Sequence, residues 1–465
     1  MDTGIRIYST LSRRKEPLEP GPGGQVRIYV CGPTVYGRVH LGNARPFVVF
    51  SVLKRYLDRR GGLRTRLVSN ITDINDKIYE TARAEGRPSV EVARDYARAY
   101  VEDTNRLGLG RPDAEPTVTE TMPKIIELIE ELVRRGLAYP SGGDVYYRVR
   151  RFPGYGKLSG RRLEEMTVTE PGGAKEDPLD FALWKGRKPD EDSWWDSPWG
   201  PGRPGWHIEC SAMAEAILGT NFEIHGGGMD LVFPHHENEI AQTEGARGQP
   251  LAKIWMHNEM LELGGEKMAK SVGNIAPLAE VLDRWPAEVV ITFFLTSHYR
   301  SKLPFTEARM LQAKEWCDRL RNALRALERG IEAPGEGHDA ALAAALLAAR
   351  ERFFAALDDD FTTPGAFAAL AELVKATNAA VEGRRPGAGQ LREARRVLVE
   401  LLDVFGLAGL QAPEPVPDGV LELARRRDAA RAARDFARAD ALREEIRALG
   451  FEVRDTPEGT QVYTA

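Results

Sequence analysis

The sequence has little cysteine and no long apolar run. Its 3 cysteines among 465 residues, at positions 31, 210 and 317, are too few and too scattered for a disulfide framework, so a reducing cytoplasm is the expected location. No apolar run approaches the length of a membrane span, and residues 1–16 lack a signal-peptide core, so no membrane association is expected. The formal net charge of −5 gives no global basic field for nucleic acid, although a local basic patch can still bind RNA.

The chain is too long for one ordinary hydrophobic core, so about two to four domains are expected. Strand and helix patterns in alternation predict a doubly wound, parallel, Rossmann-like α/β domain over residues 1–304, with an insertion at about 115–205. Ala, Leu, Arg and Glu at helical spacing then predict an α-helical bundle over residues 305–410. A proline-containing linker begins the last predicted part, a small C-terminal domain at 411–465 with an Arg-rich helix.

A strand, a turn and a helix open the parallel sheet. Residues 26–30 form the predicted strand, residues 31–45 the turn, and apolar residues at helical spacing follow from Phe47. Unpaired backbone N–H groups at the start of such a helix suit phosphate oxygens. This turn is therefore the predicted phosphate-binding part of the sheet.

Several later elements complete the expected sheet. A strand at 221–225 is expected to close at the glycines 226–228, and Pro234 is expected in the first turn of the next helix. Residues 254–257 are a further predicted strand. Residues 152–205 are rich in Gly, Pro and Trp and show little periodicity.

Two lysines lie three residues apart in the segment 264–274. Lys267 and Lys270 follow a pair of glycines, and two cations on a loop can stabilise charge on a polyphosphate. A lysine pair on a surface loop is by itself usually just solvated. Together with the phosphate-type turn at 31–45, the polyphosphate interpretation is favoured.

A second group of residues combines thiol, imidazole and carboxylate. His235 and Glu239 are four residues apart, which places both on one face of a helix, and Cys31 and Cys210 each lie beside a turn or helix start. These donors suit zinc. The alternative is two ordinary buried thiols with a His/Glu pair at a helix start. His236 can replace His235, because residues 236 and 239 also share a face.

The whole chain resembles the bacterial cysteinyl-tRNA synthetases, which are class I aminoacyl-tRNA synthetases. Residues 40–43 resemble the HIGH signature and residues 267–271 the KMSKS signature of this family, while residues 206–211 and 226–241 match its cysteine-site blocks. The C-terminal tract 439–443 is also similar. The chain departs from the signatures at two positions: Asn43 replaces the second His of HIGH, and Ala269 replaces the first Ser of KMSKS.

The resemblance implies a ligase acting on ATP, L-cysteine and tRNA(Cys). The cysteine carboxylate would attack the α-phosphate of ATP, and a ribose hydroxyl of the terminal adenosine of tRNA would then attack the activated carbonyl. Mg²⁺ would arrive with ATP, and one Zn²⁺ per chain would select the substrate thiolate. A monomer is expected.

The resemblance also implies a role for each matching residue. The catalytic residues would be His40, Asn43, Lys267 and Lys270. ATP would be bound by these four together with Leu41, Gly42, Asp230 and Ser271. Cysteine would be bound by Cys31, Thr34 and Trp206, and zinc by Cys31, Cys210, His235 and Glu239. His207, His225 and Cys317 are expected to be structural residues or outer-shell groups.

Two features remain open at the level of the sequence. Four protein ligands would close a tetrahedral zinc site, whereas catalytic zinc keeps a position open, so either the site expands to five ligands or Glu239 binds weakly. Arg431 and Arg434 are the expected tRNA contacts, but the arginines of 421–447 are interleaved with acidic residues, as in a solvated, ion-paired helix.

Two rival functions are compatible with parts of the pattern. A ligase that joins activated cysteine to an amino sugar, as in mycothiol synthesis, would use a similar catalytic domain. It would not need the roughly 150 residues that follow that domain here. A non-catalytic, zinc-holding RNA-binding protein derived from a synthetase would not need His40, Lys267 and Lys270.

Overall fold

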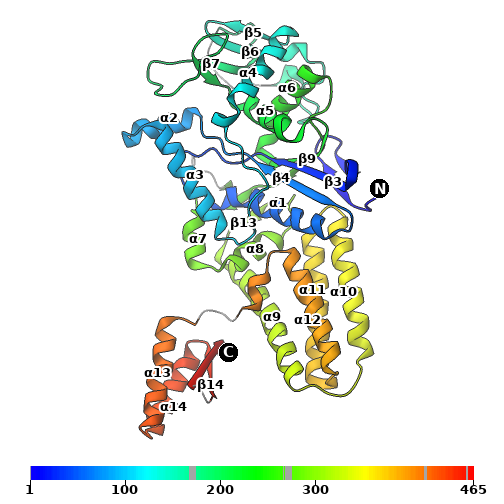
Figure 1. Cartoon of the computed structure of the whole chain (residues 1–465), viewed down its shortest axis with the longest axis vertical. Coiled ribbons are helices and arrows are strands. Elements are labelled where there is room, and N and C mark those ends of the chain that lie inside the picture. The colour runs from blue at the N-terminus through cyan, green and yellow to red at the C-terminus, as the bar shows by residue number, and fades with distance from the viewer. Residues whose placement is uncertain are drawn as a thin grey trace. The chain divides into compact units, whose positions relative to one another are not determined.

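The computed structural model of the protein describes residues 2–166, 174–264, 266–267, 275–412, 416–456 and 459–464 (Figure 1). The chain divides into two compact units, residues 1–407 and residues 408–465. No helix among the described residues is both long and apolar enough to cross a bilayer.

A parallel sheet with the strand order β10–β9–β3–β4 forms the centre of the first unit. Its strands are β3 (Gln25–Val30), β4 (Arg64–Ser69), β9 (Phe222–Gly228) and β10 (Ala252–Asn258). β3 pairs with β4 on one side and β9 on the other, so that Val30 lies opposite both Ser69 and Gly226. Because the chain continues from β3 on opposite sides, the carboxyl ends of β3 and β9 form a topological switch point, where such sheets bind ligands.

Helices cover both faces of this sheet, as the predicted doubly wound fold requires. α1 (Leu41–Arg59) packs against β4 and β9, and α5 (Trp206–Leu218) contacts β3 from the other face (Figure 1). Phe50 of α1 is buried directly against Gly226 of β9, where an added Cβ would lie 2.1 Å from the ring. The glycine therefore allows α1 to approach the end of β9.

An antiparallel sheet lies between β4 and β9 in the chain. Its order is β5–β6–β7–β8, and α4 (Val118–Arg134) precedes it with a capping box between Thr117 and Glu120. Gly142 and Gly143 form the turn between its first two strands. The strands are β5 (Ala138–Ser141), β6 (Asp144–Tyr147), β7 (Phe181–Gly186) and β8 (Gly202–Pro204).

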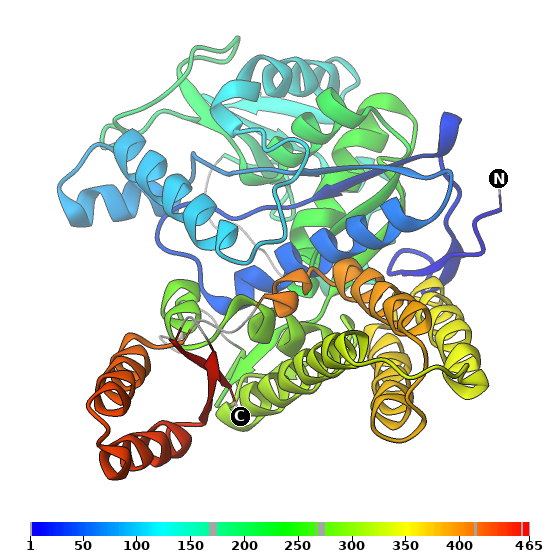
Figure 2. The same ribbon diagram turned by 60° about the horizontal axis from the view of Figure 1, so that its bottom comes forward.

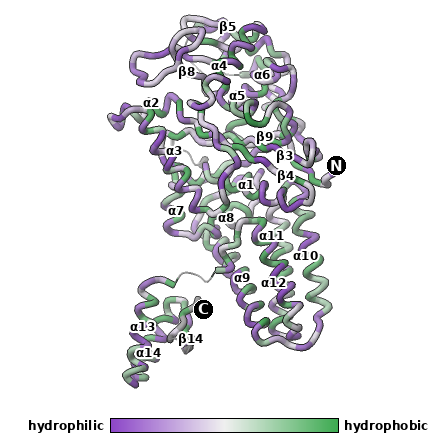
Figure 3. The backbone as a smooth tube through the Cα atoms, in the orientation of Figure 1, coloured by the Kyte–Doolittle hydropathy of each residue, from purple (hydrophilic) through white to green (hydrophobic). Residues whose placement is uncertain are grey.

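Long helices follow the α/β part and pack against one another (Figure 2). Hydrophobic and hydrophilic residues alternate along them in the manner of amphipathic helices (Figure 3). They correspond to the helices expected from the periodicity of this region. They are α9 (Glu307–Glu332), α10 (Ala340–Asp358), α11 (Thr363–Ala379) and α12 (Ala388–Val404).

The second unit has a small core of its own. Val420, Leu442 and Ile446 are buried in it. Instead of the single Arg-rich helix expected, two helices form, because Arg434 adopts a left-handed φ of 59° between them. The elements are α13 (Asp418–Ala432), α14 (Phe436–Ala448), β14 (Phe451–Thr456) and β15 (Gly459–Thr464).

Other predictions from the sequence need correction. Glycines 226–228 belong to β9 rather than closing it. Pro234 lies in the turn Val232–His236, and α6 (Glu237–Arg247) begins after it. The stretch 152–205 contains β7 and β8, which periodicity did not reveal because residues 181–184 of β7 are all buried, so no polar alternation marks the strand.

We predict that Gly226→Ala lowers the apparent melting temperature. The new methyl group would overlap the Phe50 ring, and overpacking of a core costs about 1–3 kcal/mol. The matched control is Gly389→Ala in α12, where an added Cβ meets nothing within 4 Å. Thermal unfolding that is equally affected, or unaffected, in both variants would contradict this packing.

Candidate active site and metal centre

A cavity of about 660 Å³ opens at the carboxyl edge of the parallel sheet. Its walls come from the turn after β3, the first turn of α1, and the segments that follow β9 and β10. Of the residues predicted to bind ATP or cysteine, Cys31, Thr34, His40, Gly42, Asn43, Trp206 and Asp230 line it. One cavity thus contains both predicted substrate regions.

The first turn of α1 lines this cavity, with the Leu41 N–H donating to the Ala276 carbonyl at 2.8 Å and the Asn43 N–H to the His40 carbonyl at 2.9 Å. His40 is the N-cap residue, and its backbone N–H donates to Oδ1 of Asn43 at 3.4 Å. Gly42 and Asn43 line the cavity, whereas Leu41 is fully buried and does not. This arrangement suits an anion such as a phosphate.

The candidate metal ligands converge behind the Cys31 side of the cavity. Cys31 follows β3, Cys210 lies on α5, and His235 precedes α6, which carries Glu239. The Cys31 Sγ lies 3.3 Å from Glu239 Oε1, and His235 Nε2 lies 3.1 Å from the same oxygen. All four side chains are buried. Their donor atoms lie within 4.8 Å of one another, a spacing that fits a single metal ion.

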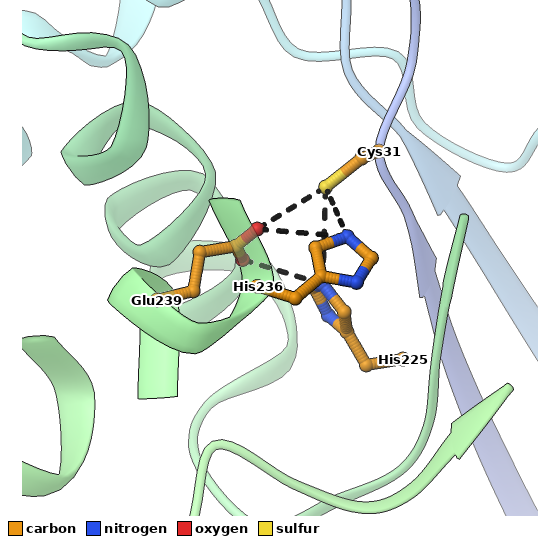
Figure 4. Close-up of side chains that lie close together, drawn as sticks. All are labelled: Cys31, His225, His236 and Glu239. Carbon is orange, nitrogen blue, oxygen red and sulfur yellow. Dashed lines mark hydrogen bonds and ion pairs between the residues drawn. The ribbon is translucent and has the colours of Figure 1, made fainter. Parts of the chain in front are cut away.

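A second donor set among the described residues shares Cys31 and Glu239. In it, His225 of β9 and His236 take the places of Cys210 and His235. These side chains point toward one another (Figure 4). His236 Nε2 lies 3.3 Å from Cys31 Sγ, and His225 Nε2 lies 3.3 Å from Glu239 Oε2.

Outer contacts orient the imidazoles of both sets. His236 Nδ1 lies 2.7 Å from His257 Nε2, and the other nitrogen of His257 lies 2.8 Å from Thr10 Oγ1. His235 Nδ1 lies 3.0 Å from His207 Nδ1. Partners of this kind fix the ring orientation of a ligating histidine. Trp206 stacks on the His235 ring with centroids 4.4 Å apart, which links the cavity wall to this set.

Burial controls the protonation of these donors. It raises the pKa of the Cys31 thiol well above its usual value. The hydrogen bond with Cys31 lowers the pKa of Cys210, but burial and the Glu239 carboxylate outweigh it and raise the pKa overall. Burial lowers the pKa of His235 to about 3 and that of His236 well below its usual value. Both imidazoles are therefore neutral at pH 7 and retain a lone pair for a metal ion.

Other predicted site residues lie apart from this cavity or outside the described residues. Lys267 ends β12 (Glu266–Lys267), of which only the backbone is described, and Lys270 and Ser271 lie outside the described residues. In the second unit, Arg431 forms an ion pair with Asp455 at 2.6 Å. Arg434 is exposed and forms no ion pair with any described residue.

Two groups at the site were missed by reasoning from the sequence. His225 is expected from the sequence to be a structural or outer-shell residue and not a candidate ligand, although its position near the carboxyl end of a buried parallel strand marks it as one. The other group is the turn Asn258–Met260 at the end of β10, which also lines the cavity. It carries no recognisable motif, so only the sheet order places it there.

Comparisons with known proteins agree with this geometry. Residues 17–315 match the family described as "tRNA synthetases class I (C) catalytic domain", residues 352–411 a "DALR domain", and residues 414–462 a "Cysteinyl-tRNA ligase anticodon binding domain".

The methionyl-tRNA synthetase of Mycobacterium tuberculosis, solved with methionyl-adenylate, has a similar fold, with a TM-score of 0.59 at 15% identity over 83% of this chain and 90% of that one. The agnB2 LeuRS of Agrobacterium radiobacter K84 gives a TM-score of 0.64 at 11% identity, over 86% of this chain and 87% of that one. The catalytic part is therefore that of a class I aminoacyl-tRNA synthetase.

Full-length relatives narrow the class to one family. The cysteine–tRNA ligase of Pelotomaculum thermopropionicum is 44% identical over 98% of this chain and 99% of its own length. That of Halorhodospira halophila is 47% identical over the same shares of the two chains. The chain belongs to the cysteine–tRNA ligase family.

We predict that Gly32→Ala damages the site. A Cβ at residue 32 would lie 1.7 Å from the backbone oxygen of Asn70, whose side chain also accepts a hydrogen bond from the Gly32 N–H at 2.9 Å. Cys31 must then move, and a displacement of about 1 Å can cost ~100-fold in rate. Metal content and cysteine-dependent ATP–pyrophosphate exchange should both fall. The exposed Gly61→Ala, with nothing within 4 Å, is the control and should match the wild type.

Proposed function

We propose that the chain joins cysteine to tRNA(Cys) in two steps at the cavity between α1 and β9. ATP first activates the cysteine carboxylate as cysteinyl-adenylate with release of pyrophosphate, and a ribose hydroxyl of the terminal tRNA adenosine then takes the cysteinyl group. The observation that carries this proposal is the junction of an anion-type helix N-terminus with a buried Cys/His/Glu cluster in one cavity. Catalysis would rely on positioning and charge stabilisation, because the mechanism needs no protein nucleophile.

ATP would lie against the first turn of α1. His40, Asn43 and the N-terminus of α1 would hold its phosphates, and Asp230, which also lines the cavity, would contact the nucleotide. Lys267 and Lys270 would neutralise the departing pyrophosphate, and Mg²⁺ would accompany ATP. Thr34 and Trp206 line the same cavity and would contact the cysteine.

The buried donor cluster fits Zn²⁺ in its chemistry. Thiolate, neutral imidazole and carboxylate are its usual ligands, and the four donors here are within reach of one ion. Bound zinc would supply a soft Lewis acid that favours a substrate thiolate over a hydroxyl. Such selection is needed because shape alone separates close neighbours such as cysteine and serine by only about 1–3 kcal/mol.

The set Cys31, Cys210, His235 and Glu239 is favoured over the set with His225 and His236. Trp206 lines the cavity and stacks on His235, so this set lies beside the substrate space. In the other set, His225 packs against the fully buried Trp255. In this proposal one zinc is bound per chain, and His225 and His236 orient the ligands.

The remaining parts of the proposal concern partners and setting. The second unit would bind the tRNA anticodon, in agreement with its match to an anticodon-binding family. The enzyme would act as a monomer in the cytoplasm, where its three free cysteines stay reduced. A cysteine–amino sugar ligase has no use for this second unit, and a non-catalytic RNA-binding protein has no use for the nucleotide cavity.

We predict that the cobalt-substituted protein identifies the donor set. Two thiolates should contribute sulfur-to-cobalt charge-transfer absorption in the wild type, so Cys210→Ser should roughly halve it. The same variant should lose most of its preference for cysteine over serine in ATP–pyrophosphate exchange, down to the roughly 1–3 kcal/mol that shape supplies. His225→Asn is the matched variant, and its charge-transfer band should remain.

The opposite result for the two variants would assign the metal to the set with His225 and His236. In that case Cys210→Ser would keep the full band, and His225→Asn would lose metal. A wild-type chain that shows no cysteine-dependent exchange, with or without zinc, and that charges no tRNA would overturn the proposed function itself.

We predict that Arg434→Glu raises the Michaelis constant for tRNA and spares ATP–pyrophosphate exchange. Its guanidinium is exposed and unpaired among the described residues, so it is available to a phosphate. Arg425→Glu is the control, because Arg425 is already paired with Glu422 at 3.1 Å. An equal effect of both reversals would indicate only diffuse charge attraction. Arg431→Glu should also disturb the unit itself, because it breaks the ion pair with Asp455.

A further inference from the structure

The guanidinium of Arg45 is completely buried and binds only backbone carbonyls. Nη1 donates to the carbonyl oxygens of Glu259 and Met260 at 2.6 and 3.2 Å, and Nη2 donates to those of His298 and Ser301 at 3.2 and 2.7 Å. All four terminal N–H bonds are thus used. Burial lowers the pKa of Arg45 to about 10, which still leaves it protonated at neutral pH.

The four carbonyls belong to two segments, residues 259–260 and residues 298–301, which are hydrogen-bonded to each other. The Glu259 N–H donates to the Tyr299 carbonyl at 2.8 Å, and β11 (Leu261–Leu263) pairs with β13 (Leu303–Pro304) directly afterwards. Arg45 itself lies on α1, in the turn of the helix that follows His40. One side chain therefore fastens the turn Asn258–Met260 to the helix whose first turn lines the same cavity.

The segment 298–301 is held from its other side as well. Asp360, which is fully buried, accepts hydrogen bonds from the Tyr299 hydroxyl at 2.6 Å and from the Arg300 Nε at 2.9 Å. It also accepts one from the Tyr8 backbone N–H at 2.9 Å. Two of the acceptors of Arg45 are consequently fixed in the structure, and Arg45 joins the turn Asn258–Met260 and this fixed segment to α1.

We propose that Arg45 is a positioning residue for adenylate formation, which sets the separation of the two cavity walls that enclose the nucleotide. This proposal rests on the proposed function, because it takes ATP as the occupant of the space between α1 and the turn Asn258–Met260. Arg45 does not line the cavity and acts only through the backbone that does. Within the described part of the chain, Arg45 forms no hydrogen bond with Cys31, Trp206 or the donor cluster on the cysteine side of the cavity.

Lysine cannot replace this residue. Its ammonium is a point donor with three hydrogens, and it cannot reach four carbonyls on two segments as a planar fork does. Arg45→Lys keeps the charge and most of the volume, so the fold should survive while the turn Asn258–Met260 shifts. A shift of about 1 Å in a wall that positions a reactant can reduce the rate by ~10–100-fold.

The test compares Arg45→Lys with Arg55→Lys in the full chain. Arg55 lies on the same helix and also fastens another segment, through the carbonyl and carboxylate of Asp403, but it is remote from the cavity wall. Arg45→Lys should raise the Michaelis constant for ATP and lower the exchange rate by ~10–100-fold in kcat/KM. The Michaelis constant for cysteine, the zinc content and the transfer of cysteine from preformed adenylate to tRNA should stay within about twofold. Arg55→Lys should leave all of these readouts unchanged.

A second variant, Asp360→Asn, keeps the proposal testable if Arg45→Lys does not fold. Asp360 has a φ of 61°, which asparagine tolerates, so Asp360→Asn should fold and show the same ATP-specific effect at smaller size. Wild-type ATP kinetics in both variants would overturn the proposal. Equal effects on the Michaelis constants for ATP and cysteine, on the zinc content and on the transfer of cysteine to tRNA would also overturn the proposal, because they would indicate a general structural role. If the wild-type protein shows no cysteine-dependent ATP–pyrophosphate exchange, the result would instead count against the proposed function.

Discussion

A carboxylate without exposure to water is the constraint around which this site is built. Glu239 is fully buried in α6, and burial by itself would raise the pKa of its carboxyl, but contacts with His225, His235 and Cys31 outweigh burial and lower it. A buried charge of this kind is costly unless a cation or a full set of donors compensates it. Neutral imidazoles and thiols provide only part of that compensation. A bound divalent cation would complete it, which is why the proposed zinc explains the convergence of β3, β9, α5 and α6 at one point.

The placement of small residues makes this convergence possible. Gly226 admits Phe50 of α1, and Gly227 admits the His236 ring, whose Cε1 would lie 2.9 Å from an added Cβ. The same two contacts connect the nucleotide side of the cavity to the donor side through the end of one strand. Substrate selection and activation are therefore proposed to occur at one switch point of the sheet, where the thiol and carboxylate ends of one cysteine can be held together.

Much of the fold was predictable because its signals are local. The strand–turn–helix unit at β3 and α1 and the helices α9–α12 follow from periodicity, and the donor set with Cys210 follows from the residue types and the resemblance to the family. His225 was not predictable as a neighbour of Glu239, because their contact depends on the pairing of β9 beside β3. Arg45 was also missed, since four backbone carbonyls leave no trace in residue types. The strand β7 was missed because burial on both faces removes the alternation that periodicity detects.

X-ray absorption at the zinc edge of the metal-loaded protein tests the central account most directly. The account predicts two sulfur ligands in the free enzyme, from Cys31 and Cys210, and one additional sulfur ligand when cysteine is added. Serine at the same concentration should leave the sulfur count unchanged. An unchanged count on addition of cysteine would contradict direct selection of the thiolate by the metal.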